Sequence, residues 1–385
     1  MSSLAEEFRS SFPIFDSRVY LNSCSQGALS HQVRAAYESF LDGWEREGAQ
    51  WAAWVERNEL VRNSWADLVN APSDAVAVTT SVSAGLSAFI SSLDLTGQRN
   101  RIVITDFEFP TAGQIAFAQQ ARGAEIVIVP AHDATVSVED IAQVVDERTA
   151  LVIMTHVCFR NGSKLDPKAV ARVAHASGAL IAVDSYQAIG SVPIDVVDLD
   201  VDVLVCGALK YLLGSAGLGF MYVRPGLIDG RAPTATGWFA DSDIFAMDHR
   251  RYSPSLTGRR FESGTPPVPN LFAGLAGIDL VRSVGVPAIE AHVQDLIDRF
   301  RCGLDELGAT IVTPVERERR GAMVAIACTD QDAMVARLDA MGIGTSCRDG
   351  NLRVSMHLYN SADDIDTCLQ ALHQHQALLR LQPRP

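Results

Sequence analysis

The feature that most constrains the fold is a regular alternation of short apolar segments with amphipathic segments between residues 75 and 225. Val and Ile dominate the apolar segments, which is typical of strands buried on both faces of a sheet. Strands that alternate with helices predict a mostly parallel sheet covered by helices on both sides. The predicted strands are Val76–Thr79, Arg101–Thr105, Glu125–Val129, Leu151–Thr155, Leu180–Val183, Val203–Cys206 and Gly219–Val223.

The pattern changes after this region. Residues 231–270 are rich in Pro, Gly and aromatic residues, and the end of the chain predicts strand, helix, strand, helix. The last of these helices begins with Ser361 and Asp364, which have the spacing of a capping box. We therefore predict an α/β fold with a large domain at 1–280, built on a seven-stranded sheet, and a small α+β domain at 281–385. The N-terminal segment, 1–20, is expected to pack with the small domain.

Composition excludes several classes of function. The 385 residues carry a net charge of −14, which argues against a protein dedicated to nucleic acids or anionic membranes. No apolar run reaches the ~18 residues of a membrane helix. The seven cysteines are scattered and include no C-x-x-C pair, so we expect reduced thiols in a cytoplasmic protein with no metal site.

Two ionisable residues stand in strongly apolar surroundings. Asp184 ends one predicted strand, and Lys210 closely follows the next one, in C-G-A-L-K-Y-L-L-G. Burying either charge is costly, so one interpretation is a structural ion pair. The other is a lysine that forms a Schiff base with a pyridine aldehyde, beside a carboxylate that keeps the ring nitrogen protonated. Both residues would lie where open α/β sheets bind their ligands, at the carboxyl ends of the strands.

Other segments at strand ends or in loops also carry candidate residues. Each one alone has an ordinary structural explanation, such as a helix cap, a core aromatic residue, a Pro-rich turn or a solvent-facing arginine. Their order along the chain is more informative than any single one. The segments are T-T-S-V-S-A-G from Thr79, F-E-F-P-T from Phe107, T-H-V from Thr155, D-S-Y-Q from Asp184, K-Y-L-L-G from Lys210, F-E-S-G-T-P-P from Phe261 and R-V-S-M-H-L-Y-N from Arg353.

In this order, from about Tyr20 to the end of the chain, the segments resemble those of the pyridoxal-phosphate enzymes of aminotransferase class V. That family includes cysteine desulfurases, kynureninases, isopenicillin-N-epimerase-like proteins and C–S lyases. The resemblance implies the PLP-dependent transferase fold type I and pyridoxal 5'-phosphate as cofactor. It also implies a small amino-acid substrate and a homodimer whose active site is shared across the interface.

The resemblance implies a role for each matching residue around the cofactor ring. Lys210 would bind the cofactor and act as the catalytic base, and Asp184 would hold the pyridine nitrogen. Phe109 would stack on the ring, and Gln187 would lie near its phenolic oxygen.

Further residues would hold the ends of the cofactor and the substrate. Ser81 and Val82 would bind the phosphate at a helix N-terminus, together with Thr265 from the neighbouring subunit. Arg353 would bind the substrate carboxylate. The residue before the lysine is usually His or Tyr in the family, but here it is Leu209, so the phosphate must rely on other groups.

The reaction itself is less constrained by the sequence. We expect a lyase that cleaves a Cβ–S or other Cβ–X bond; the alternatives are an aminotransferase, an epimerase, a cysteine desulfurase or a non-enzymatic PLP-binding module. Cys347 lies six residues before Arg353, and Arg348 beside it would lower the pKa of its thiol. The surrounding loop does not match the desulfurase loops, so a plain surface thiol is the favoured interpretation.

Overall fold

The computed structural model describes residues 4–132 and 134–382. Its centre is a seven-stranded sheet made of the seven predicted strands, in the spatial order β2-β8-β7-β6-β5-β3-β4. Only β8 runs antiparallel to its neighbours in this sheet, so the mixed but mostly parallel sheet confirms the predicted fold class. The strands are β2 (Val76–Thr79), β3 (Arg101–Thr105), β4 (Glu125–Val129), β5 (Thr149–Thr155), β6 (Leu180–Asp184), β7 (Val203–Gly207) and β8 (Gly219–Val223).

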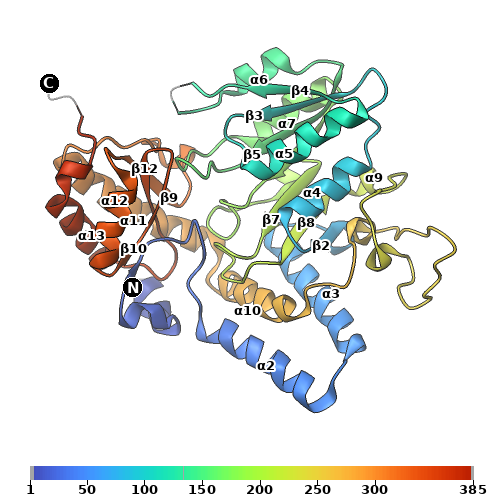
Figure 1. Cartoon of the computed structure of the whole chain (residues 1–385), viewed down its shortest axis with the longest axis horizontal. Helices are drawn as coiled ribbons and strands as arrows, with labels where there is room; N and C mark the ends of the chain where they lie inside the picture. The colour runs from blue at the N-terminus through green and yellow to red at the C-terminus, as the bar shows by residue number, and fades with distance from the viewer. Residues whose placement is uncertain (1–3, 133, 383–385) are drawn as a thin grey trace.

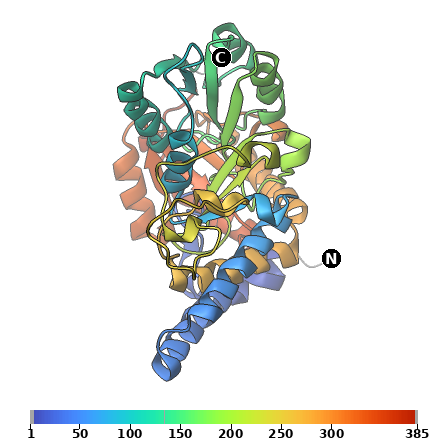
Figure 2. The ribbon, with the colours of Figure 1, turned by 90° about the vertical axis from the view of Figure 1, so that its right-hand side faces the viewer.

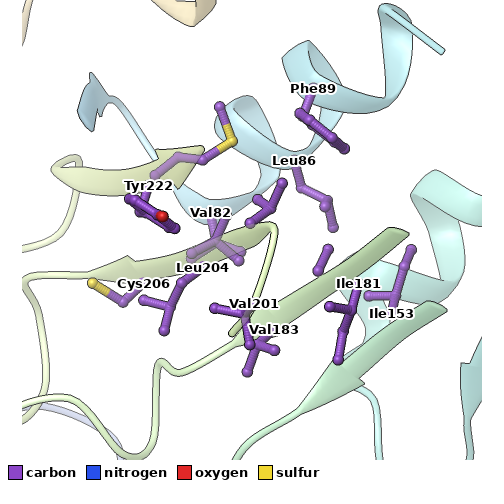
Figure 3. Close-up of a cluster of buried hydrophobic side chains, with 14 of the residues drawn as sticks. Val82, Leu86, Phe89, Ile153, Ile181, Val183, Val201, Leu204, Cys206 and Tyr222 are labelled. Carbon is purple, nitrogen blue, oxygen red and sulfur yellow. The ribbon is translucent and has the colours of Figure 1, made fainter. Parts of the chain in front are cut away.

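Helices cover this sheet because each presents an apolar face to it. In Figure 3 the side chains of Val82, Leu86 and Phe89 on α4 point toward the strands that carry Ile181 and Leu204. All five are buried, and each large apolar side chain stabilises the fold by about 1.5–3 kcal/mol. The helices of this part are α4 (Val82–Ser91), α5 (Pro110–Ala118), α6 (Val138–Val144), α7 (Pro167–Ala176), α8 (Val196–Leu199) and α9 (Pro225–Ile228).

Three long helices that the sequence analysis did not specify pack together, and one of them, α3 (Trp51–Leu68), contacts β2 and β8 of the sheet. α10 (Val268–Val284) packs on α2 (His31–Glu47) and α3. The hairpin of α2 and α3 extends away from the rest of the molecule (Figures 1 and 2). No single helix in the described ranges is long and apolar enough to cross a membrane, whereas α10 and α11 (Val286–Glu306) meet that test only together, with a bend of 77°.

The C-terminal part is a smaller α+β unit. A three-stranded antiparallel sheet has the order β11-β12-β9, and the predicted capping box of Ser361 and Asp364 opens α13. The short strand β1 (Val19–Tyr20) pairs in parallel with β10 (Ile343–Gly344), so the start of the chain lies on this unit (Figure 1). The remaining elements here are α1 (Leu4–Phe8), β9 (Met323–Ala327), α12 (Gln331–Ala340), β11 (Ser346–Arg348), β12 (Asn351–Ser355) and α13 (Ala362–Gln374).

The buried apolar side chains form two clusters. The first lies around the large sheet and includes Leu271 and Ile278 of α10. The second includes Val281 of the same helix together with Phe12 and Leu21 from the N-terminal segment. The division of the chain near residue 280, and the assignment of the N-terminal segment to the small domain, stay predictions.

Candidate active site

A cavity of about 230 Å³ opens at the carboxyl ends of the parallel strands. Six of the eight predicted site residues line it, although they come from four separate segments of the chain. The parallel sheet brings them together because the carboxyl ends of all its parallel strands lie at one edge. The lining residues are Ser81, Val82, Ser83, Phe109, Thr111, Thr155, Phe159, Asp184, Tyr186, Gln187, Leu209 and Lys210.

The backbone around Lys210 is tightly enclosed by glycines. A Cβ atom on Gly27 would lie 2.4 Å from the Lys210 carbonyl oxygen, and one on Gly277 would lie 2.3 Å from the Leu212 carbonyl oxygen. The amide of Gly27 also donates a hydrogen bond to the carbonyl of Leu209, at 2.9 Å. Side chains at these positions would therefore displace the turn, and the glycines fix the lysine relative to the sheet.

The Lys210 amine lies among aromatic rings. Its Nζ atom is 4.4 Å from the centroid of the Tyr186 ring and 5.9 Å from that of Phe109. Burial lowers the pKa of Lys210 to about 8, and the positive charge of Arg353 acts in the same direction. Among the described residues, Lys210 forms no ion pair, so the amine is available to react.

Asp184 is buried, with 7% of its surface exposed, and its carboxylate accepts a hydrogen bond from the Tyr186 amide at 2.9 Å. Burial raises its pKa, while the hydrogen bond and the charge of Lys210 oppose that rise. The structural ion pair left open by the sequence is not formed, because no salt bridge in the described part of the chain includes Asp184. The carboxylate instead faces the cavity.

A second buried acid was missed by the sequence analysis. Glu108 Oε1 accepts hydrogen bonds from the Thr105 hydroxyl at 2.8 Å and from the Thr155 amide at 2.9 Å. Its Oε2 atom is buried without a hydrogen-bond partner. Burial, assisted by the charge of Asp184, raises the pKa of Glu108 to about 8. Its place directly after a buried strand was the signal that could have revealed it.

Two helix N-termini meet on another side of the cavity. Ser81 is the N-cap of α4 and accepts a hydrogen bond from the Ala84 amide, whereas Phe109 is the N-cap of α5. The hydroxyl groups of Ser83 and Thr111 are 3.1 Å apart and join the two first turns. Free amides and partial positive charge at helix N-termini attract anions, so this region suits a phosphate group.

Phe109 and Gln187 also line the cavity. Phe109 lines the cavity with 43% of its surface exposed, and its ring lies edge-on to that of Phe159, 5.0 Å away. Gln187 is buried and donates a hydrogen bond to the Cys24 carbonyl at 3.0 Å. An exposed aromatic face beside the lysine amine offers a stacking surface for a flat ring.

Arg353 lies next to the cavity, behind its lining. Its guanidinium donates to the Phe159 carbonyl at 2.8 Å and to the Ser346 hydroxyl at 3.0 Å. The side chain is 4% exposed, and its Nε atom is buried without a partner. In the described ranges no carboxylate pairs with it, although a buried cation normally requires one.

Thr265 and Cys347 lie outside the cavity. Thr265 is exposed on the loop before α10. Cys347 pairs across the sheet with Leu352, on the opposite face from Ser346 and Arg353, and its thiol donates to Asp332 at 3.3 Å. The expected lowering of its pKa is wrong: burial and the charge of Asp332 raise the pKa of Cys347 and outweigh Arg348.

The groups around the cavity fit each part of pyridoxal phosphate. The reactive amine suits the aldehyde and the buried carboxylate suits the ring nitrogen. The aromatic face suits the face of the ring, and the two helix N-termini suit the phosphate. Among the described residues, no group of three or more His, Cys, Asp or Glu could hold a metal ion. Fold and site together define a fold type I enzyme that depends on this cofactor.

The comparison with protein families agrees with this assignment. The model of the aminotransferase class-V family matches residues 19–368, so the chain belongs to that family. An uncharacterized aminotransferase of Bacillus subtilis (strain 168), YcbU, is 31% identical over 95% of this chain and 96% of its own length. A kynureninase of Pseudomonas fluorescens is 29% identical over 87% of this chain and 83% of its own.

Solved structures show the same fold. An apo cysteine desulfurase from Thermococcus onnurineus NA1 superposes with a TM-score of 0.88 at 22% identity, covering 97% of this chain and 98% of that one. The cystine C–S lyase C-DES in complex with its reaction product cysteine persulfide superposes with a TM-score of 0.86 at 22% identity, covering 94% of this chain and 99% of that one. At this identity the likeness concerns the fold, and the reaction must be argued from the site.

Proposed function

We propose that the protein is a lyase that cleaves a Cβ–S or other Cβ–X bond of a small amino acid. The observation that carries an amino-acid substrate is Arg353, a buried guanidinium with no carboxylate partner among the described residues, adjacent to the cavity that holds Lys210. A substrate carboxylate would supply the missing charge through a bidentate contact.

The cavity residues supply the proton transfer. Bound pyridoxal phosphate provides an electron sink for negative charge at the substrate α-carbon. Asp184 holds the ring nitrogen in its protonated state, and Lys210, with its pKa lowered to about 8, takes the α-proton as general base. Loss of the β-substituent then gives, after hydrolysis, a 2-oxo acid, ammonia and the released thiol or other leaving group.

Two observations favour elimination over the alternatives. Apart from the reactive Lys210 the cavity lining holds no basic side chain, and Arg353 behind it would bind only the α-carboxylate. A dicarboxylic amino donor of the kind that many aminotransferases use would therefore find no second cation in the lining. Cys347 lies on the face of β11 opposite to Arg353, which disfavours a desulfurase that uses this thiol. The kynureninases and the cystine C–S lyase among the similar proteins are consistent with chemistry at the β-carbon.

The test is a product assay on the purified protein with pyridoxal phosphate. Cystine, cysteine, S-alkylcysteines and β-chloroalanine are supplied separately, and 2-oxo acid, ammonia and released thiol are quantified. We expect equal amounts of 2-oxo acid and ammonia without any added oxo acid. Arg353→Lys should raise the KM by about tenfold or more, since lysine cannot make the bidentate contact. Amine exchange that requires an oxo acid, with no elimination product, would assign an aminotransferase instead.

We also propose that the enzyme works as a homodimer. Thr265 is exposed and does not line this chain's own cavity, as expected if it serves the site of a second subunit. Leu41, Trp44 and Leu60 on the α2–α3 hairpin are exposed and offer an apolar contact surface. Sedimentation equilibrium tests the dimer. A cytoplasmic location is part of the proposal, supported by seven cysteines that are all free.

A further inference from the structure

Tyr186 occupies a position that the sequence analysis left without a role. It lies two residues after Asp184, lines the cavity, and places its ring 4.4 Å from the Lys210 amine. The other aromatic residues in the cavity lining are Phe109 and Phe159, and neither carries a hydroxyl group. Tyr186 is therefore the single phenol in the lining.

Tyr186 and Gly207 are matched in size. A Cβ atom on Gly207 would lie 2.3 Å from both the hydroxyl oxygen and the Cζ atom of Tyr186, so only glycine allows the phenol to lie there. Gly207 pairs with Gly219, which pairs in turn with Thr79, two residues before Ser81. The phenol therefore lies over the end of β7, between Asp184 on β6 and the N-terminus of α4.

The Tyr186 hydroxyl group has a proton to donate. The backbone of Leu209 lies near its oxygen and opposes the rise of its pKa. No hydrogen bond within the described ranges uses its proton. Burial raises the pKa of Tyr186, so the phenol stays protonated at neutral pH and acts as a donor.

We propose that the Tyr186 hydroxyl donates a hydrogen bond to the phosphate group of the cofactor and supplies the contact that Leu209 cannot make. The residue before the lysine, Leu209, is apolar and its side chain can donate no hydrogen bond, whereas the Tyr186 hydroxyl lies near the Leu209 backbone and can donate one. Gly207 is the condition for this arrangement, since any larger residue would displace the phenol. The inference rests on the family's cofactor and is independent of which reaction the enzyme performs.

The experiment compares two probes, pyridoxal phosphate and pyridoxal, which differ only in the phosphate group. Their dissociation constants are measured by equilibrium dialysis of the full-length protein and of the Tyr186→Phe variant. Phe keeps the ring and removes the hydroxyl. We expect the dissociation constant for pyridoxal phosphate to rise about tenfold, as for the loss of a hydrogen bond to a charged group, with that for pyridoxal changed by less than about twofold.

Tyr222→Phe is the matched control, because this tyrosine packs in the core of β8 and does not line the cavity. It should leave both constants unchanged. If Tyr186→Phe raises the dissociation constants of both probes equally, the residue serves ring stacking or folding, and the proposal is overturned. Unchanged binding of both would overturn it as well.

A second pair of variants tests the match in size. Tyr186→Ala should weaken the binding of pyridoxal phosphate more than the binding of pyridoxal. Adding Gly207→Ser to that variant should partly restore the tighter binding of pyridoxal phosphate relative to pyridoxal, because the serine side chain enters the space that the phenol left. If the double variant shows no recovery while its thermal midpoint equals that of Tyr186→Ala, the phenol does not lie at the phosphate.

Discussion

Glu108 should make the protein less stable as the pH rises, and Glu108→Gln should remove this effect. In the folded protein the carboxyl group stays protonated up to pH about 8, whereas the unfolded chain titrates near its ordinary value of 4.5. Between these values the unfolded state has lost a proton that the folded state keeps. Stability therefore falls with rising pH, and the loss is complete above the folded pKa.

The size of the effect follows from the two pKa values. Their difference corresponds to about 5 kcal/mol, with about 1.4 kcal/mol lost per pH unit. Among the groups that face Glu108, Asp184 disfavours a second negative charge, whereas Arg160 and the hydrogen bonds from Thr105 and Thr155 favour the ionised form. Burial is the largest cause, so the acid stays neutral in the folded protein.

Equilibrium urea unfolding at pH 5, 6, 7 and 8, with the cofactor saturating, measures this effect. Gln keeps an oxygen that accepts from Thr105 and Thr155, and it adds no charge at any pH. The free energy of unfolding of Glu108→Gln minus that of the wild type should therefore increase steadily from pH 5 to pH 8. Glu45→Gln, on the exposed face of α2, is the control and should run parallel to the wild type. Parallel curves for Glu108→Gln as well would refute a buried neutral acid.

Four further outcomes are expected. Lys210→Ala should abolish the visible absorption of lysine-bound cofactor, measured by spectrophotometry. Gly277→Ala should lower the thermal midpoint and weaken cofactor binding, because its Cβ would lie 2.3 Å from the Leu212 carbonyl oxygen. Cys347→Ser should change kcat by less than about twofold in the product assay, since this thiol faces Asp332; loss of activity would restore the desulfurase alternative. Glu262→Gln should cost roughly 1–3 kcal/mol in urea unfolding, because buried Arg62 loses one of its two carboxylate partners and keeps the other, Glu59.

The strands of the large sheet were predictable because they are buried and have a simple composition. β2, β3, β4 and β8 begin and end at the predicted residues, and the other three differ by one or two residues. Burial on both faces makes such strands apolar throughout, so no knowledge of the tertiary structure is needed to recognise them.

The helix α10 shows why other elements were not predictable. It begins in a Pro-rich region and contains Gly274 and Gly277, which normally argue against a helix interior. The glycines are required by contacts with Leu218 and with the Leu212 carbonyl, which come from a distant part of the chain. Their cost to the helix is offset by packing that a single sequence does not reveal.

The site residues divide in the same way. Lys210 and Asp184 stand out in the sequence because a charge in an apolar segment needs an explanation. Tyr186 and Glu108 do not stand out, since a tyrosine and a glutamate after a strand are ordinary. Their importance depends on the space above Gly207 and on the orphaned Oε2 atom, and both are properties of the assembled sheet edge.

Buried charged residues in this molecule fall into two groups, those that have an oppositely charged partner and those that have none. Arg62 and Glu262 are both buried and lie 2.6 Å apart, so each compensates the other and holds the loop before α10 against the sheet. Asp184 and Arg353 are buried to a similar degree, but in the described structure neither has an oppositely charged partner. Leaving such groups unpaired lowers stability, and a fold without a ligand would gain by replacing them. Their presence beside one cavity, Asp184 in its lining and Arg353 behind it, is explained if a bound cation and a bound carboxylate complete the two pairs.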